Sequence, residues 1–147
     1  MILLNPGPVT LTNRVKNSLL KEDLCHREPE FSKLQQDIRE KLLRVYNLNH
    51  SDWTSILLTG SGTAAVEALI TSLVPKNAKL LIAENGVYGE RLQKIASTFR
   101  IDNDQIKSDW IDAINLVSLE KAIATKKYSH LALVHHETTT GRLNELD

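Results

Sequence analysis

Glycine and hydroxyl residues near the middle of this chain form the segment best suited to bind an anion. The motif Gly60-Ser61-Gly62-Thr63 follows an apolar run and opens an alanine-rich helical pattern. A glycine turn between a strand and a helix leaves the first N–H groups of the helix unpaired, and the helix dipole adds partial positive charge. The hydroxyls of Ser61 and Thr63 add donors that suit a terminal phosphate monoester. The motif therefore predicts a phosphate site.

Two other interpretations of this glycine loop remain open. The spacing Gly60-x-Gly62-x-x-Ala65 also matches the dinucleotide fingerprint, and Glu84 follows at about the 20-residue distance of a ribose-binding acid. An NAD-binding dehydrogenase domain is therefore an alternative, although that fingerprint usually lies in the first strand, turn and helix of its domain. The loop is also compatible with a tight turn that binds nothing.

Two further polar loops follow apolar runs that are typical of buried strands. One loop is Glu84–Gly89, after residues 79–83, and the other is His135–Gly141, after residues 130–134. Helical patterns separate these strands, which predicts a parallel sheet covered on both faces. Ligands of such sheets bind beyond the carboxyl ends of the strands. We therefore expect the glycine loop and these two loops to converge at one edge.

Hydrophobic periodicity and capping residues predict the remaining elements. A helix after Pro29 places Leu34, Ile38 and Leu42 on one face, with charged residues elsewhere. In chain order we expect an irregular segment at 4–8, a short helix from Thr12 or Asn13 to Leu20, a helix that follows Pro29 and has Val45 on its apolar face, a buried strand at 56–59, a helix at 63–73, a strand at 79–83, a helix at 90–98, a short strand at 105–110, a helix from Ser118 to Lys126 and a strand at 130–134.

Composition excludes several classes of protein. The 147 residues carry 18 basic and 18 acidic side chains, and the resulting zero net charge argues against a nucleic-acid scaffold or a polybasic membrane binder. No apolar run approaches the ~20 residues of a membrane span, and the N-terminus does not resemble a secretory signal. The single cysteine, Cys25, excludes an internal disulfide and fits a plain thiol in a reducing cytoplasm.

Five segments together resemble the class V branch of the fold-type I aminotransferases, which use pyridoxal 5′-phosphate (PLP). These segments are residues 3–10, 25–31, 60–68, 85–91 and 136–141. Within the branch, the Cys-His-Arg-Glu and Glu-Thr-Thr-Thr-Gly sequences point to members that pass the amino group of 2-aminoethylphosphonate to pyruvate, giving phosphonoacetaldehyde and alanine. Members that act on serine or alanine with glyoxylate share the glycine loop and remain an alternative. The resemblance implies an α/β fold with three α/β/α layers and a mostly parallel sheet.

The resemblance also implies roles for individual residues at the cofactor. The loop Ser61-Gly62-Thr63 would hold the PLP phosphate through backbone N–H groups and hydroxyls. Tyr88 would stack on the pyridine ring, and a packed core tyrosine is the alternative. Thr138 would place its hydroxyl near the phenolic oxygen of the ring, with Thr139 as its substitute, whereas ordinary hydrogen bonds at a strand end are the alternative for both.

Residues near the N-terminus would receive the substrates in such an enzyme. Pro8 would line the substrate mouth, and His26 and Arg27 would bind the phosphonate or the keto-acid carboxylate. A solvated surface pair is the alternative for His26 and Arg27. We expect no metal site at His135 and His136, because adjacent residues of a strand point to opposite faces.

The resemblance divides the chain into two parts and sets the expected partners. Residues 1–50 would hold the N-terminal segment and helices, and residues 51–147 a partial PLP-binding large domain. The Schiff-base lysine and the aspartate at the pyridine nitrogen are expected beyond Asp147, so we expect the chain as given to be a fragment that does not transaminate. The expected partners are a small-molecule amino donor, a keto acid and a second copy in a homodimer, and a non-catalytic binding module is a further alternative.

Overall fold

Thr12, one of the two capping residues that the sequence predicts, caps the first helix of the chain. In the computed structural model, which describes residues 2–146, its side chain accepts a hydrogen bond from the Val15 backbone N–H. Helix α1 (Asn13–Asn17) continues into the 3₁₀ helix η1 (Ser18–Leu20), which confirms the predicted helix between these bounds. These elements belong to the first of two compact units, Met1–Thr59 and Gly60–Asp147.

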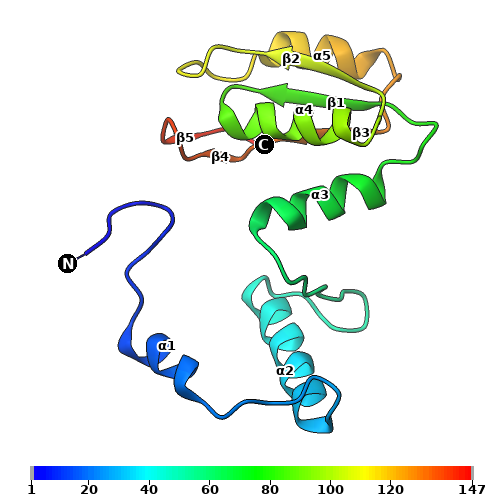
Figure 1. Cartoon of the computed structure of the whole chain (residues 1–147). Coiled ribbons are helices and arrows are strands. Elements are labelled where there is room, and N and C mark those ends of the chain that lie inside the picture. The colour runs from blue at the N-terminus through cyan, green and yellow to red at the C-terminus, as the bar shows by residue number, and fades with distance from the viewer. Residues whose placement is uncertain (1, 147) are drawn as a thin grey trace. The chain divides into compact units, whose positions relative to one another are not determined.

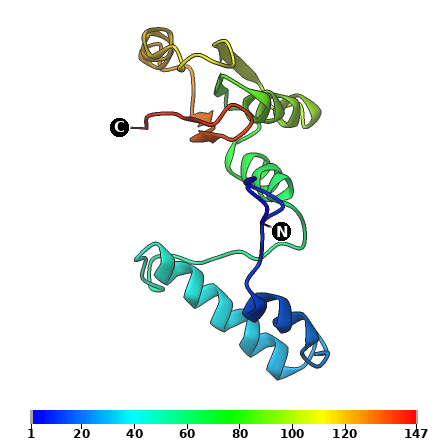
Figure 2. The same cartoon turned by 90° about the vertical axis from the view of Figure 1, so that its left-hand side faces the viewer.

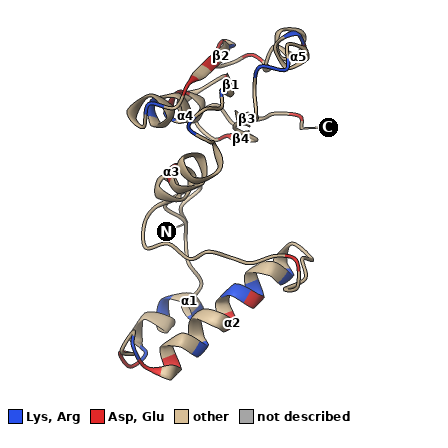
Figure 3. Cartoon of the chain, turned by 90° about the vertical axis from the view of Figure 1, so that its right-hand side faces the viewer, with Lys and Arg blue, Asp and Glu red and all other residues tan. Residues whose placement is uncertain are grey.

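Helix α2 (Pro29–Val45) is the longest element of the first unit (Figure 1). Proline at the first turn has a fixed φ and lacks the N–H that would be unpaired there, so the predicted helix is confirmed and includes Pro29 as its first residue. Charges of both signs alternate along its exposed side (Figure 3), and Lys33 pairs with Asp37 one turn away. Leu43 is the residue that this helix buries.

Residues 56–59 do not form the buried strand that their apolar sequence predicts. The segment carries no ladder hydrogen bonds to any described strand, and Ile56 and Leu58 are 79% and 51% exposed. A β-strand requires a neighbouring strand for its N–H and C=O groups. Because no strand between residues 2 and 146 pairs with this segment, hydrophobic sequence alone does not make it a strand.

A parallel sheet of three strands lies at the centre of the second unit (Figure 2). Its order is β2-β1-β3, with β1 (Leu80–Glu84) between β2 (Asn103–Lys107) and β3 (His130–Leu133). All five residues of β1 are buried, whereas β2 and β3 are partly exposed. The predicted strands are confirmed here, except that β2 ends at Lys107 and leaves Trp110 outside the sheet.

Helices cover both faces of this sheet. On one face, Leu80 and Ile82 pack against α3 (Gly62–Leu73) and α4 (Val87–Thr98), through a cluster that includes Ile70 and Leu92. On the other face, Leu81 and Ala83 pack against Leu119 of α5 (Leu116–Ala124). The alternation of side chains along β1 therefore supplies two cores, which gives the predicted three-layer α/β/α architecture.

Several element boundaries differ from the sequence prediction. Helix α4 begins at Val87, not at residue 90, so Tyr88 lies in its first turn. Helix α5 begins at Leu116 because Asn115, and not Ser118, provides the side-chain cap. It ends at Ala124, and Lys126 just beyond it has a left-handed φ of 54°. No helix among the described residues is long and apolar enough to span a membrane.

A short hairpin follows the sheet and was not predicted from the sequence. Strands β4 (His136–Glu137) and β5 (Arg142–Leu143) pair antiparallel, so the threonine-rich segment forms the turn between them. Glu137 pairs with Arg142 in the backbone register. The hairpin therefore holds Thr138 and Thr139 directly beyond the carboxyl end of β3.

Candidate functional site at the carboxyl edge of the sheet

The N-terminus of α3 has the free donors that an anion site requires. Ser61 occupies the N-cap position, but its side chain makes no capping hydrogen bond. The first N–H paired with the cap residue is that of Ala65, which donates to the Ser61 carbonyl at 3.2 Å. The N–H groups before it are the ones that an α-helix leaves unpaired. Ser61 and Gly62 are exposed and Thr63 is partly buried, so a ligand has access to these donors.

Arg91 links this helix start to Tyr88. Its Nη1 donates to Thr63 Oγ1 at 3.1 Å, and its Cζ lies 4.7 Å from the centre of the Tyr88 ring, within the range of a cation–π contact. Tyr88 and Arg91 stand one turn apart on α4, and Thr63 belongs to α3. The glycine loop and the loop after β1 therefore meet at this guanidinium, as the sequence predicted for the two loops.

Glu137 links the first turn of α4 to the threonine loop. Its carboxylate is fully buried, and Oε2 accepts a hydrogen bond from the Tyr88 backbone N–H at 3.0 Å. Oε1 accepts from the Thr139 hydroxyl at 2.6 Å and from the Thr139 N–H at 3.3 Å. A carboxylate at the start of α4 also interacts favourably with the helix dipole. The loops after β1 and β3 therefore converge as predicted.

The two threonines proposed for the cofactor oxygen differ in their hydrogen bonds. The Thr139 hydroxyl is engaged by Glu137, whereas Thr138 is partly buried and its hydroxyl has no hydrogen-bond partner among residues 2–146. Of the two, Thr138 thus has the hydroxyl available for a ligand. Its role toward a cofactor stays a prediction.

A buried pair of asparagines forms a second set of hydrogen bonds at the carboxyl edge of the sheet. Asn85 follows β1 and Asn144 follows β5, and their side-chain amides exchange hydrogen bonds of 2.8 and 3.1 Å. Asn144 also donates to the Val134 carbonyl at 2.7 Å, and Asn85 to the Asp112 carbonyl at 3.0 Å. Both amides are nearly inaccessible to solvent. The loop after β1 is therefore tied to the hairpin at a second point.

Glu84, the acid required by the dinucleotide interpretation, is not displayed to a ligand. It is 5% exposed, and its Oε1 bonds the Lys107 ammonium at 2.9 Å, which raises the pKa of Lys107. Its other oxygen is buried and has no hydrogen-bond partner in the described part of the chain. A ribose-binding carboxylate needs to reach a ligand hydroxyl, so this geometry does not favour the dinucleotide alternative.

The residues predicted to receive substrates all lie in the first unit. Pro8 is exposed in the irregular segment before α1. His26 and Arg27 are exposed in a turn before α2, which is closed by the Glu28 N–H donating to the Cys25 carbonyl at 3.0 Å. Their substrate roles stay predictions. Within residues 2–146 no group of three or more potential ligands is placed to hold a metal ion.

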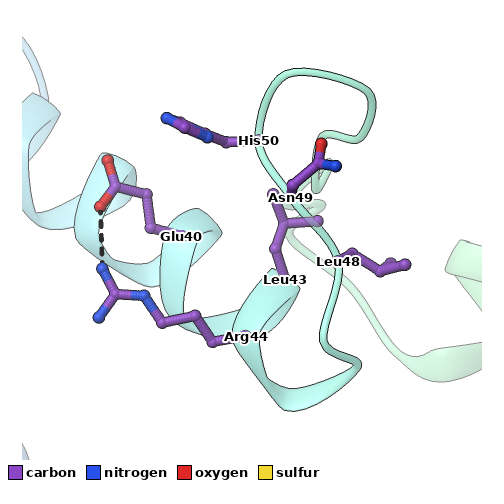
Figure 4. Close-up of a pocket in the computed structure, with 6 residues that line it drawn as sticks. All are labelled: Glu40, Leu43, Arg44, Leu48, Asn49 and His50. Atoms are coloured by element: carbon purple, nitrogen blue, oxygen red, sulfur yellow. Dashed lines mark ion pairs between the residues drawn. The ribbon is translucent and has the colours of Figure 1, made fainter.

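A hollow elsewhere in the first unit contains none of these predicted residues. It lies at the C-terminal end of α2, where the Arg44 guanidinium pairs with the Glu40 carboxylate at 3.7 Å (Figure 4). Its lining consists of Glu40, Leu43, Arg44, Leu48, Asn49 and His50. We assign no function to it.

Solved structures with the same fold are aminotransferases. The alanine–glyoxylate aminotransferase from a Nostoc species superposes with a TM-score of 0.87 and 32% identity, over 99% of this chain and 38% of that one. An aspartate aminotransferase from Thermus thermophilus gives a TM-score of 0.85 and 29% identity, over 98% of this chain and 39% of that one. A scan against models of protein families finds no match. Over almost its whole length this chain is therefore similar in sequence and in fold to aminotransferases, in agreement with its resemblance to the class V branch of fold-type I.

Curated relatives that are similar in sequence carry the name of one particular aminotransferase. The chain is 40% identical, over 146 residues, to the 2-aminoethylphosphonate–pyruvate transaminase of Bacillus cereus (strain ATCC 10987). The match covers 99% of this chain and 40% of the relative, so the chain spans about two fifths of the length of the curated relatives it matches. The family is thus enzymatic, and the aminotransferase interpretation is better supported than the dinucleotide one.

Sequence reasoning assigned no role to Arg91 or Glu137, although both lie within the segments that carry the resemblance. Arg91 lies three residues beyond Tyr88, but this spacing places the two on one helix face only because α4 begins at Val87 and not at residue 90. Glu137 directly precedes the threonine run. Its burial and its bond to Tyr88 depend on a contact between distant parts of the chain, which no local pattern reveals.

Proposed function

We propose that this chain forms the phosphate-holding and ring-stacking part of a PLP-dependent aminotransferase that uses 2-aminoethylphosphonate and pyruvate. The observation that carries the proposal is a series of contacts. Arg91 donates a hydrogen bond to Thr63 and makes a cation–π contact with the Tyr88 ring, and the Tyr88 backbone N–H donates to Glu137 beside the threonine loop. The name of the relatives at about 40% identity supports the choice of substrates. The products would be phosphonoacetaldehyde and alanine.

The residues at the carboxyl edge fit the phosphate of PLP. A Cβ added to Gly62 would meet no atom within 4 Å, so the backbone at the start of α3 is open to a ligand. The Ser61 side chain makes no cap bond, which leaves its hydroxyl available beside the unpaired N–H groups. The Arg91 guanidinium adds a full positive charge next to them. Donors and charge together suit a dianionic monoester.

Each side chain of this site has a distinct task in the proposed reaction. The Ser61-Gly62-Thr63 loop would hold the phosphate and so fix the position of the ring. Tyr88 would cover one face of the ring and exclude water there. The free hydroxyl of Thr138 would donate to the phenolic oxygen of the ring. The cofactor, when bound, supplies the electron sink that stabilises negative charge on the substrate carbon. We assign no residue of this chain to the Schiff-base lysine or the ring-nitrogen aspartate.

Substrate binding and assembly are proposed on the resemblance. His26 and Arg27 would supply cationic and hydrogen-bonding groups for the phosphonate or the carboxylate, and both are exposed in the turn before α2. Pro8 would line the mouth of the site. We further propose that the enzyme acts as a homodimer in the cytoplasm, where the exposed thiol of Cys25 would stay reduced.

A spectral titration tests cofactor binding by this chain. PLP absorbance and fluorescence are followed as protein is added, with NADH as the competing ligand and Gly62→Asp as the matched variant. We expect a saturable response to PLP and none to NADH. The PLP response should be lost in Gly62→Asp, because the added carboxylate would occupy the phosphate position and repel the negatively charged phosphate. A response to NADH alone would favour the dehydrogenase alternative.

A chimaera tests the choice of substrates. This chain replaces the matching part of the Bacillus cereus relative. Alanine formation from 2-aminoethylphosphonate and pyruvate is then compared with glycine formation from serine or alanine and glyoxylate. We expect turnover with 2-aminoethylphosphonate and a rise in KM for it in Arg27→Gln. A folded, PLP-loaded chimaera that prefers the other donors would refute the proposed substrate.

A further inference from the structure

The guanidinium of Arg91 touches two side chains that the proposed site needs. It donates to Thr63 Oγ1 at 3.1 Å and stands 4.7 Å from the centre of the Tyr88 ring. Thr63 belongs to the loop that would hold a phosphate, and Tyr88 is the residue that would stack on the pyridine ring. A single side chain thus connects the phosphate end of the site to its ring end.

The charge of Arg91 lacks a counter-ion in this position. The side chain is partly buried, and no carboxylate among residues 2–146 lies within ion-pair distance of it. The helix start at Thr63 contributes partial positive charge of its own. Two positive groups side by side in a partly desolvated place are unfavourable, and a bound anion removes that cost. The arrangement therefore selects a ligand with negative charge over a neutral ligand of the same shape.

The hydrogen bond from Arg91 also sets the direction of the Thr63 hydroxyl. Oγ1 accepts from the guanidinium, which has no acceptor capacity of its own, so the hydroxyl proton points away from Arg91. The Thr63 hydroxyl is then a donor for any acceptor at the start of α3. Without Arg91, this hydroxyl is free to rotate and to bond water or the backbone.

We propose that Arg91 is a positioning residue of the phosphate subsite, which orients the Thr63 hydroxyl and adds the charge that selects a phosphorylated ligand. This inference rests on the proposed function. Tyr88 keeps the guanidinium in place through its ring face, so loss of Tyr88 weakens phosphate selection indirectly.

The test compares two probes that differ only in the phosphate. Pyridoxamine 5′-phosphate and pyridoxamine lack the aldehyde that reacts with surface lysines, and calorimetry gives the dissociation constant of each for the 147-residue chain. We expect the unaltered chain to prefer the phosphorylated probe, and Arg91→Gln to reduce that preference about tenfold, as for the loss of one charge-assisted hydrogen bond. Lys94→Gln removes an exposed positive charge from the same helix and should leave the preference unchanged.

Two further variants keep the result decisive. Arg91→Lys retains the positive charge but lacks the planar guanidinium, so the preference for the phosphorylated probe should fall about threefold. This variant tests the role of Arg91 if Arg91→Gln does not fold. Thr63→Val removes only the oriented hydroxyl and should lose less of the preference than Arg91→Gln, which also removes the charge. The double variant should lose little more than Arg91→Gln alone, because the contribution of the hydroxyl depends on Arg91.

The outcomes separate the two proposals. An unaltered chain without preference for the phosphorylated probe overturns both the cofactor assignment and the role of Arg91. A clear preference that persists in folded Arg91→Gln and Arg91→Lys, or equal weakening of both probes, overturns the role of Arg91 and leaves the cofactor assignment standing. Additive losses in the double variant contradict the action through Thr63.

Discussion

The Glu137 carboxylate accepts a hydrogen bond from the backbone N–H of Tyr88 at 3.0 Å, although the two residues lie far apart in the sequence. The acceptor is fully buried, and its second oxygen takes both donors of Thr139. Three hydrogen-bond donors therefore offset the free-energy cost of burying this carboxylate, which has no arginine or lysine partner among the described residues. The first turn of α4 and the threonine loop are held as one piece by this group.

Replacement of Glu137 should destabilise the second unit in a graded way. Glu137→Ala leaves buried donors unpaired and a cavity, so we expect a loss of about 2–4 kcal/mol in the free energy of unfolding. Glu137→Gln keeps one acceptor but turns an amide N–H toward a donor, for a loss of about 1–2 kcal/mol. Urea denaturation followed by circular dichroism measures both. Glu90→Gln, an exposed acid in the same helix, is the control and should change little; equal effects at both positions would contradict the capping role.

Two glycines of the site should respond in opposite ways to an added methyl group. A Cβ on Gly86 would lie 2.5 Å from Cγ and Cδ of Glu137, whereas a Cβ on Gly62 meets nothing within 4 Å. We expect Gly86→Ala to cost about 1–3 kcal/mol of stability. Gly62→Ala, at the first position of α3, should be neutral or stabilising by up to about 1 kcal/mol.

Binding separates these two variants further. Gly62→Ala places its methyl group where the proposed phosphate would lie, so it should weaken PLP binding while thermal unfolding shows an intact fold. A Gly62→Ala chain that melts early and binds PLP normally would argue against an open cradle at this helix start.

The strands and helices around the central sheet are predictable because their signals are local. The continuous apolar sequence of residues 80–83 indicates a strand buried on both faces, and Thr12 and Pro29 mark the starts of helices. Residues 56–59 carry the same apolar signal but form no strand, because ladder hydrogen bonds depend on a partner that composition does not specify. Propensity thus predicted the candidate strands, and tertiary pairing decided which of them joined the sheet.

The candidate site was predictable in its loops and less so in its contacts. Strand topology alone brings the loops after β1 and β3 to one edge, so Tyr88 and Thr138 could be nominated from their positions. The engagement of Thr139 by Glu137, and of Thr63 by Arg91, depends on the approach of elements distant in the chain. The burial of Glu84 likewise follows from packing against Gly89, whose added Cβ would lie 2.5 Å from the Glu84 Cβ.

The buried amides of Asn85 and Asn144 should show strong coupling. Each single change to alanine leaves the partner amide unpaired in a dry environment, and we expect a loss of about 2–3 kcal/mol for each. The double change removes both members at once, so its cost should fall short of the sum by about 1 kcal/mol or more. A double-mutant cycle from urea denaturation measures this coupling. Asn77→Ala, at an exposed position, is the control, and additive losses would show that the two amides stabilise the unit independently.

The amino edge of the sheet carries an ionic network whose pH dependence has a definite sign. The Lys79 ammonium bonds the Asp104 carboxylate at 2.8 Å, and the Tyr128 hydroxyl donates to the same carboxylate at 2.7 Å. The hydrogen bond from Lys79, and then that from Tyr128, lowers the pKa of Asp104. The hydrogen bond to Asp104 raises the pKa of Lys79 and also that of Tyr128, where burial adds to the effect.

These shifts predict a loss of stability at both ends of the pH range. Asp104 has a lowered pKa in the folded state, so its contribution is present above the ordinary value of about 3.9 and is lost as the pH falls through the lowered value. Lys79 and Tyr128 have raised pKa values, so their contributions are present below the ordinary values of about 10 and are lost as the pH rises through the raised ones. Asp104→Asn removes the shared acceptor charge and should flatten both limbs. Tyr128→Phe should flatten mainly the alkaline limb.

Urea midpoints measured at closely spaced pH values from acid to alkali provide the test. Glu120→Gln removes an exposed carboxylate of α5 that pairs with no described residue, and it should preserve the shape of the profile. Because the Lys79 and Asp104 side chains are 28% and 44% exposed, salt should weaken both limbs of the unaltered chain and leave the Asp104→Asn profile unchanged. An Asp104→Asn profile with the original acid limb would assign that limb to other carboxylates and remove Asp104 as its cause.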